Sequence, residues 1–208
     1  MEKLTINKNI TKIDFQEEWR ELNLVIYAEG LGKVRDLIGL LPVIKRLNLK
    51  FFLNGAKKES YEAVQILSSL GVYSGIVINE KADWEKLTDL MYYALCGRVP
   101  HAPIEPFQYV YDMYQRNILV DYGVLYSVNL CALCDSVLKN QHKDTKNTEK
   151  HRENWQRFFY EPTACAACAG WRICLGKYES LKNKSGCQQF TTEWLNLIEI
   201  QKFKNLKI

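Results

Sequence analysis

Short apolar runs alternate with segments of helical periodicity over the first half of the chain. Three apolar runs predict buried strands, at residues 22–27 (LNLVIY), 49–53 (LKFFL) and 75–79 (GIVIN). Three further segments carry apolar side chains at helical spacing, at residues 34–47, 60–70 and 83–95. Short strands that are buried on both faces and joined by helices predict a parallel sheet with right-handed crossovers.

This sheet is either half of a barrel or a small open α/β layer. A weaker pattern before residue 22 leaves room for one more strand and helix, and Pro42 interrupts the first predicted helix. The character of the chain changes after Pro103 and Pro106. We therefore predict two domains, a parallel α/β domain over residues 1–103 and a cysteine-rich domain over residues 104–208.

The second predicted domain has few apolar runs. Residues 118–130 alternate around Gly123 in the manner of a hairpin, and the polar segment 139–157 predicts a solvated helix or loop. An amphipathic helix is expected at residues 192–203. The histidines in the polar segment, His142 and His151, are expected to lie on the solvent-exposed surface and not to bind a metal.

Composition limits the function classes. The chain has 208 residues, 47% of them hydrophobic and 25% charged, which is ordinary for a globular protein. A net charge of +4 is mild, so nucleic acid is not the expected partner. The polar start of the chain lacks a signal-peptide pattern, and no apolar run is long enough for a membrane span. We expect a cytoplasmic protein.

Cysteine usage gives the sharpest chemical indication. Six of the seven cysteines fall between residues 131 and 187, and in a reducing compartment such clusters indicate metal binding more than disulfides. A C-x-x-C pair followed by two more cysteines offers four thiolates, which suit tetrahedral zinc or a cubane iron–sulfur cluster. These candidate ligands are Cys165, Cys168, Cys174 and Cys187. Cys96 stands apart and is expected to be a small buried apolar residue.

The segment from Cys165 to Tyr178, CAACAGWRICLGKY, resembles the central motif of the SPASM domain. This domain is the cluster-binding extension of many radical SAM enzymes that modify peptides. Its motif reads C-x2-C-x5-C-x3-C, with a late cysteine after a gap. Cys168 and Cys174 continue the match, Cys187 takes the late position, and Tyr178 replaces the fourth cysteine. The resemblance implies a complete outer [4Fe-4S] ligand set and an inner set that lacks a ligand.

The upstream half resembles the second to fourth strands of a radical SAM partial barrel. Such barrels carry Gly-Gly-Glu after the second strand and Thr-Asn-Gly after the third, where this chain has YAE (residues 27–29) and LNG (residues 53–55). Glu29 is either a remnant of a contact to S-adenosylmethionine or a partner in an ion pair. The defining C-x3-C-x2-C motif is absent, because no cysteine precedes Cys96. Binding and cleavage of S-adenosylmethionine are therefore not expected.

The resemblance implies a half TIM-like barrel followed by a small cysteine-rich α+β domain of the SPASM type. Another C-x-x-C pair, Cys131 and Cys134, has three open interpretations. It could complete a zinc ribbon with Cys165 and Cys168, form a partial inner-cluster or redox site, or be purely structural. Trp171 and Trp194 are expected to pack over the metal loop.

The leading functional hypothesis is an iron–sulfur accessory protein of a peptide-modification system, without radical catalysis of its own. The resemblance implies that it binds a precursor peptide or a partner radical SAM enzyme, and the open edge of the sheet is a candidate surface. Two other hypotheses remain open. One is a zinc-stabilised binding module, and the other is an electron-transfer protein with a single cluster.

Overall fold

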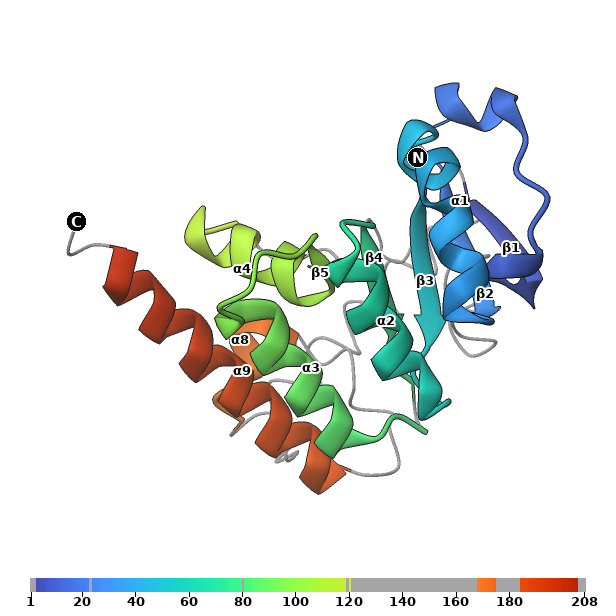
Figure 1. Cartoon of the computed structure of the whole chain (residues 1–208). Helices are drawn as coiled ribbons and strands as arrows, with labels where there is room; N and C mark the ends of the chain where they lie inside the picture. The colour runs from blue at the N-terminus through green and yellow to red at the C-terminus, as the bar shows by residue number, and fades with distance from the viewer. Residues whose placement is uncertain are drawn as a thin grey trace, which may run out of the picture.

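A parallel sheet of five strands organises the chain (Figure 1). The computed structural model describes residues 3–22, 24–79, 81–118, 120, 168–174 and 184–205. Each strand pairs in parallel with the next, so that the order across the sheet follows the order in the sequence. The strands are β1 (Lys3–Asn9), β2 (Val25–Gly30), β3 (Lys50–Asn54), β4 (Ser74–Val77) and β5 (Ile104–Glu105).

Helices connect the strands, and further helices come after the last strand in the sequence. Two 3-10 turns, Ile10–Lys12 and Glu17–Glu21, lie between β1 and β2. Each strand is added on the same side of the strand before it, because the strand order never reverses. With right-handed crossovers, this order places all the connecting helices on one face of the sheet. The helices are α1 (Val34–Arg46), α2 (Glu59–Ser69), α3 (Trp84–Cys96), α4 (Phe107–Gln115), α8 (Trp171–Cys174) and α9 (Lys184–Asn205).

The register of the strands assigns their side chains to two faces. Ser74 donates its hydroxyl to the carbonyl of Val64 in α2 at 3.2 Å, so its row faces the helices. That row is mostly apolar and buried, and it consists of Leu4, Ile26, Phe51, Ser74 and Ile104. Because side chains alternate along a strand, the neighbouring row lies on the opposite face. Its members are Thr5, Tyr27, Phe52, Gly75 and Glu105.

Gly75 makes room for an aromatic ring on that opposite face. A Cβ at this position would lie 2.6 Å from Cε1 of Phe52 and 3.0 Å from Cβ of Glu105. The ring of Phe52 therefore lies over the main chain of β4, and it also stacks on Tyr27 with centroids 5.5 Å apart. The sheet consequently carries an aromatic layer on the face away from α2.

Helix α9 packs against α3 and α4 with large aromatic side chains (Figure 1). The ring of Trp194 is fully buried, with its centroid 5.2 Å from that of Phe107, and Phe190 lies 5.5 Å from Trp84. Two side-chain hydrogen bonds add to this contact, from Tyr92 to Glu193 at 2.6 Å and from Tyr114 to Glu199 at 2.8 Å. The C-terminal helix thus shares a hydrophobic core with the α/β part of the chain.

The predicted α/β class with parallel strands is confirmed, and the structure adds two strands to the three predicted. Strand β5 continues the sheet beyond residue 103. Helix α1 runs through Pro42 without interruption, and α9 begins at Lys184, eight residues before the predicted start at residue 192. The prediction that Cys96 is buried is wrong, because it is exposed at the end of α3. The polar segment 139–157 and nearly all of the predicted hairpin lie outside the described residues.

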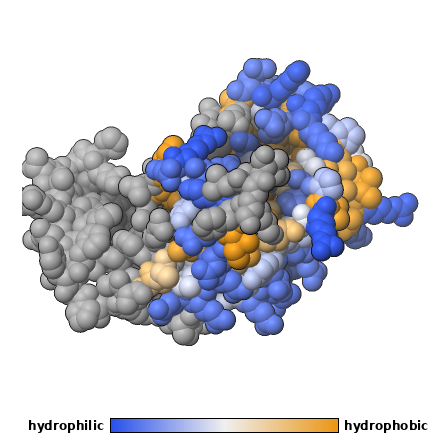
Figure 2. All heavy atoms as spheres, turned by 90° about the vertical axis from the view of Figure 1, so that its left-hand side faces the viewer, coloured by the Kyte–Doolittle hydropathy of each residue, from blue (hydrophilic) through white to orange (hydrophobic). Residues whose placement is uncertain are grey.

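The surface of the described residues is largely polar on the side shown in Figure 2, with apolar side chains emerging in a few areas. Large apolar residues with substantial exposure are Val34, Ile38, Tyr92, Val99, Ile118 and Ile200. None of the described helices combines the length and the apolar character that crossing a membrane requires.

Candidate metal centre and strand-end hollow

Three of the predicted metal ligands lie in two segments that pack against each other. Cys168 stands before α8, Cys174 is the last residue of α8, and Cys187 lies in the first turn of α9. The side chains of Cys174 and Cys187 are buried, and Cys168 is half-buried. The remaining predicted ligands, Cys165 and the pair Cys131 and Cys134, lie outside the described residues.

Thr191 joins these two segments. The sulfur of Cys168 lies 3.7 Å from Oγ1 of Thr191, and the same hydroxyl donates to the carbonyl of Cys187 at 2.9 Å. Gly170 permits this approach, since a Cβ there would lie 2.4 Å from Oγ1 of Thr191. The side chain of Thr191 is itself buried. A threonine one turn after Cys187 therefore sets the distance between the C-x-x-C segment and α9.

Within the described part of the chain, no three His, Cys, Asp or Glu side chains are grouped closely enough to hold a metal ion. The structure brings the segment of Cys168 and Cys174 to the helix of Cys187, but it does not describe a complete ligand set. The donor chemistry fits a thiolate-bound centre, because Cys174 and Cys187 are buried and sulfur ligands suit zinc and iron–sulfur clusters. Trp194, expected over the metal loop, packs on Phe107 within the core, and most of that loop lies outside the described residues.

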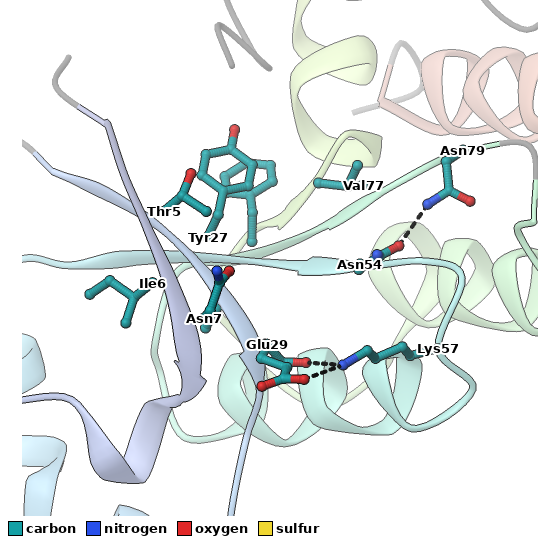
Figure 3. Close-up of a pocket in the computed structure, with 11 residues that line it drawn as sticks. Thr5, Ile6, Asn7, Tyr27, Glu29, Asn54, Lys57, Val77 and Asn79 are labelled. Atoms are coloured by element: carbon teal, nitrogen blue, oxygen red, sulfur yellow. Dashed lines mark hydrogen bonds and ion pairs between the residues drawn. The ribbon is translucent and has the colours of Figure 1, made fainter. Parts of the chain in front are cut away.

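A second candidate site is a hollow of about 420 Å³ at the carboxyl ends of β1 to β4 (Figure 3). In parallel α/β sheets, ligands commonly bind at this end of the strands. Thr5 lines it from within β1, and the polar lining residues near the strand ends are Asn7, Glu29, Asn54, Lys57 and Asn79.

The polar side chains of the hollow are paired with one another. Nζ of Lys57 lies 3.1 Å from Oε1 of Glu29, which makes a partly exposed ion pair. Nδ2 of Asn79 donates to Oδ1 of Asn54 at 2.6 Å, and that oxygen also accepts from the main-chain N–H of Ala56 at 2.9 Å. The amide nitrogen of Asn54 is directed away from Asn79 in Figure 3. The rim of the hollow therefore presents the ion pair of Glu29 and Lys57, which has no net charge, and the side-chain amide N–H groups of Asn54.

An aromatic wall forms the inner side of the hollow. Tyr27 and Phe52 stack at 5.5 Å with an angle of 29° between their rings, and both line the hollow. The hydroxyl oxygen of Tyr27 is buried and has no hydrogen-bond partner among the described residues. Burial raises the pKa of Tyr27 to about 12, so the hydroxyl stays protonated near neutral pH. The hollow thus combines an apolar wall with polar groups at its rim.

Sequence reasoning identified the cysteines and missed most of this hollow. Glu29 and Asn54 were noted only within degenerate barrel motifs, and of the two interpretations of Glu29 the structure shows the ion pair, with Lys57. A usable signal was present, because Glu29, Asn54 and Asn79 are polar residues at the ends of predicted strands. Thr5 lies on β1, whose mixed sequence gives only a weak strand pattern.

Comparison of the chain with protein-family models, with curated proteins and with solved structures finds no match. The function must therefore be inferred from the two sites and from the fold.

Proposed function

We propose that this chain is a non-catalytic accessory protein of the radical SAM type, which binds an iron–sulfur cluster and takes part in peptide modification. The observation that supports it most is the packing of the Cys168 segment on α9 through Thr191. Thr191 contacts the sulfur of Cys168 and the carbonyl of Cys187, which are 19 residues apart in the sequence. In this proposal, a [4Fe-4S] cluster is held by Cys165, Cys168, Cys174 and Cys187.

The sheet supports the same proposal through its topology. A partial TIM-like barrel would require parallel strands in sequential order, as the five strands here have, whereas a doubly wound sheet would reverse its strand order. In such barrels the functional groups stand at the carboxyl ends of the strands, where the hollow lies here. The sequence has no cysteine before Cys96, so this half barrel has no thiolate for a cluster at its strand ends.

Under this proposal, the cluster is structural and the half barrel binds a partner. Four thiolates around a cluster would fix a segment whose own apolar surface is small, since metal binding and folding are coupled in such regions. The partner is a precursor peptide or the radical SAM enzyme that modifies it. Zinc in the same thiolate set would instead make the chain a zinc-stabilised binding module.

The proposal is tested by purifying the protein without oxygen, supplying iron and sulfide, and measuring bound iron, sulfide and zinc. We expect about four irons and four sulfides per chain, with broad visible absorbance near roughly 400 nm. One tightly held zinc without that absorbance would identify the zinc module. A protein that holds neither metal would refute both forms of the proposal.

A further inference from the structure

Strand β1 forms one edge of the sheet, and half of its main-chain groups point away from it. Main-chain groups of successive residues in a parallel ladder point alternately to the two neighbouring strands. The carbonyl of Leu24 accepts from the N–H of Lys50 at 3.3 Å, so even-numbered residues of β2 point to β3. Val25 and Tyr27 therefore point to β1, where the register pairs Val25 with Lys3.

This alternation fixes the outward groups of β1. The main chains of Leu4 and Ile6 bond to β2, which leaves the N–H and C=O groups of Lys3 and Thr5 directed outward, before the register shifts between Ile6 and Asn9. No described strand pairs with that outer edge. An edge with free main-chain donors and acceptors is a template for another extended segment.

The same edge borders the hollow. Thr5 contributes outward main-chain groups, and the side chains of Thr5 and Asn7 line the hollow beside Tyr27 (Figure 3). A strand added to β1 would place alternate side chains on this face of the sheet. Because the side chain of Thr5 is short, a large side chain on the added strand can extend over it toward the Tyr27 and Phe52 wall.

We infer that the outer edge of β1 binds an extended peptide by strand addition, with one large apolar side chain of the peptide inserted into the hollow. Main-chain hydrogen bonds would supply affinity, and the hollow would supply side-chain preference. The inference rests on the proposed function, in which a peptide is a partner, and it names the place where that peptide binds.

A second copy of this chain fits the edge less well than a foreign peptide. Two β1 strands paired around a two-fold axis would each present Thr5 and Asn7 to the face that carries the hollow. These short polar side chains do not match an aromatic wall formed by Tyr27 and Phe52. The occupant is therefore a peptide that carries a large apolar residue in an otherwise extended segment.

Two substitutions of one residue separate strand addition from side-chain effects. Thr5→Pro removes an outward N–H and leaves the bonds from Leu4 and Ile6 to β2 in place, since proline is tolerated on edge strands. Thr5→Val keeps the N–H and the shape of the side chain. The probe is a positional-scanning library of acetylated peptides of 7 residues, the length of β1, followed by fluorescence polarisation. Far-ultraviolet circular dichroism of each variant checks that it is folded.

We expect the library to select one large apolar residue at a single position. Thr5→Val keeps every outward main-chain group of the edge, so it should retain much more of the binding than Thr5→Pro. Thr5→Pro should weaken binding by about tenfold or more, because a hydrogen bond is lost and the proline ring obstructs the edge. N-methylation of alternate peptide residues should have a similar effect. A Tyr27→Leu variant should keep binding and weaken the preference for that large apolar residue, because part of the aromatic wall is removed.

Equal binding by the Thr5→Pro and Thr5→Val variants, or no binding from any part of the library, would overturn the inference. So would a dimer of the original protein that Thr5→Pro dissociates, because the edge would then pair with a second copy. Metal content measured on the same samples separates this result from the proposed function. A protein that holds iron and binds no peptide would refute only the edge site, and a peptide-binding protein without a metal would refute only the cluster.

Discussion

The sulfur of Cys168 lies 3.7 Å from Oγ1 of Thr191, although 23 residues separate them in the sequence. The hydroxyl of Thr191 also donates to the carbonyl of Cys187, so one buried side chain contacts both segments of the candidate metal centre. Such a hydroxyl can orient a thiolate ligand without itself binding the metal. Thr191 is thus a positioning residue for the proposed cluster.

Replacing Thr191 tests this role. Thr191→Val removes the hydroxyl and keeps the shape of the side chain, and we expect about a tenfold loss of metal affinity, as is typical for outer-shell hydrogen-bond partners. Thr191→Ser restores the hydroxyl and should restore the affinity. Competition with a chelator, followed by visible absorbance, measures the loss. Equal metal retention in both variants would show that the hydroxyl does not support the centre.

Gly75 is required by the ring that lies over it. Gly75→Ala would place a Cβ 2.6 Å from the ring of Phe52, and we expect a loss of about 1–3 kcal/mol in the free energy of unfolding from overpacking. Gly39→Ala is the matched control in α1, where no atom lies within 4 Å of the added Cβ. That change should stabilise the protein by about 0.5–1 kcal/mol, because glycine is unfavourable in a helix. Urea denaturation of both variants checks the two opposite signs, and a Gly75→Ala variant as stable as the original protein would contradict the packing of Phe52 on β4.

The buried carboxyl group of Glu105 makes stability depend on pH. Burial raises its pKa, and hydrogen bonds from the hydroxyl of Tyr73 and the N–H of Tyr109 lower it in part. A folded pKa above the unfolded value of about 4.3 means that the folded protein holds this proton more tightly. The contribution of Glu105 to stability is therefore complete below the unfolded pKa of about 4.3, and it is lost as the pH rises through the pKa of the folded protein.

Glu105→Gln removes this ionisation and should remove its share of the pH dependence. The stability of the variant relative to the original protein should rise as the pH increases from about 4 toward 8, since only the original carboxyl must ionise in a buried place. Urea denaturation at several pH values measures this difference. A difference that stays constant over the whole range would show that Glu105 has the same pKa in both states.

Trp194 is the main anchor of α9. It is fully buried between Phe107 and Phe190, at centroid distances of 5.2 and 5.5 Å. We expect Trp194→Ala to cost about 3–5 kcal/mol, while Trp194→Phe should cost clearly less because an aromatic ring remains. Chemical denaturation followed by circular dichroism compares the two variants. If Trp194→Ala costs less than about 1 kcal/mol, α9 does not share the core of the sheet and its helices.

The central strands and helices could be predicted because each has a clear pattern. Strand β3 has three consecutive apolar residues at its centre, FFL, and α2 has apolar residues at helical spacing. Strand β1 was only weakly predicted because it is an edge strand, which pairs on one side only. Its sequence, KLTINKN, accordingly mixes polar and apolar residues. Strand β5 has only 2 residues, which is too short to give any periodicity.

The two candidate sites differ in what the sequence could indicate. Cysteine spacing is a local pattern, so the proposed ligands could be named without a structure. The contact between Cys168 and Thr191 depends on how α9 packs, and no local pattern contains that information. The hollow likewise depends on register, because Thr5 and Tyr27 become neighbours only when β1 pairs with β2.

We propose that one iron–sulfur cluster is held by the thiolates of the C-terminal segment. The iron content of single cysteine variants tests this proposal most directly. Protein reconstituted without oxygen should hold about four irons per chain. Cys168→Ala should lose most of this iron, while Cys96→Ala, at an exposed position at the end of α3, should keep it. Full iron content in the Cys168→Ala variant, or its loss in the Cys96→Ala variant, would contradict the assignment of the cluster.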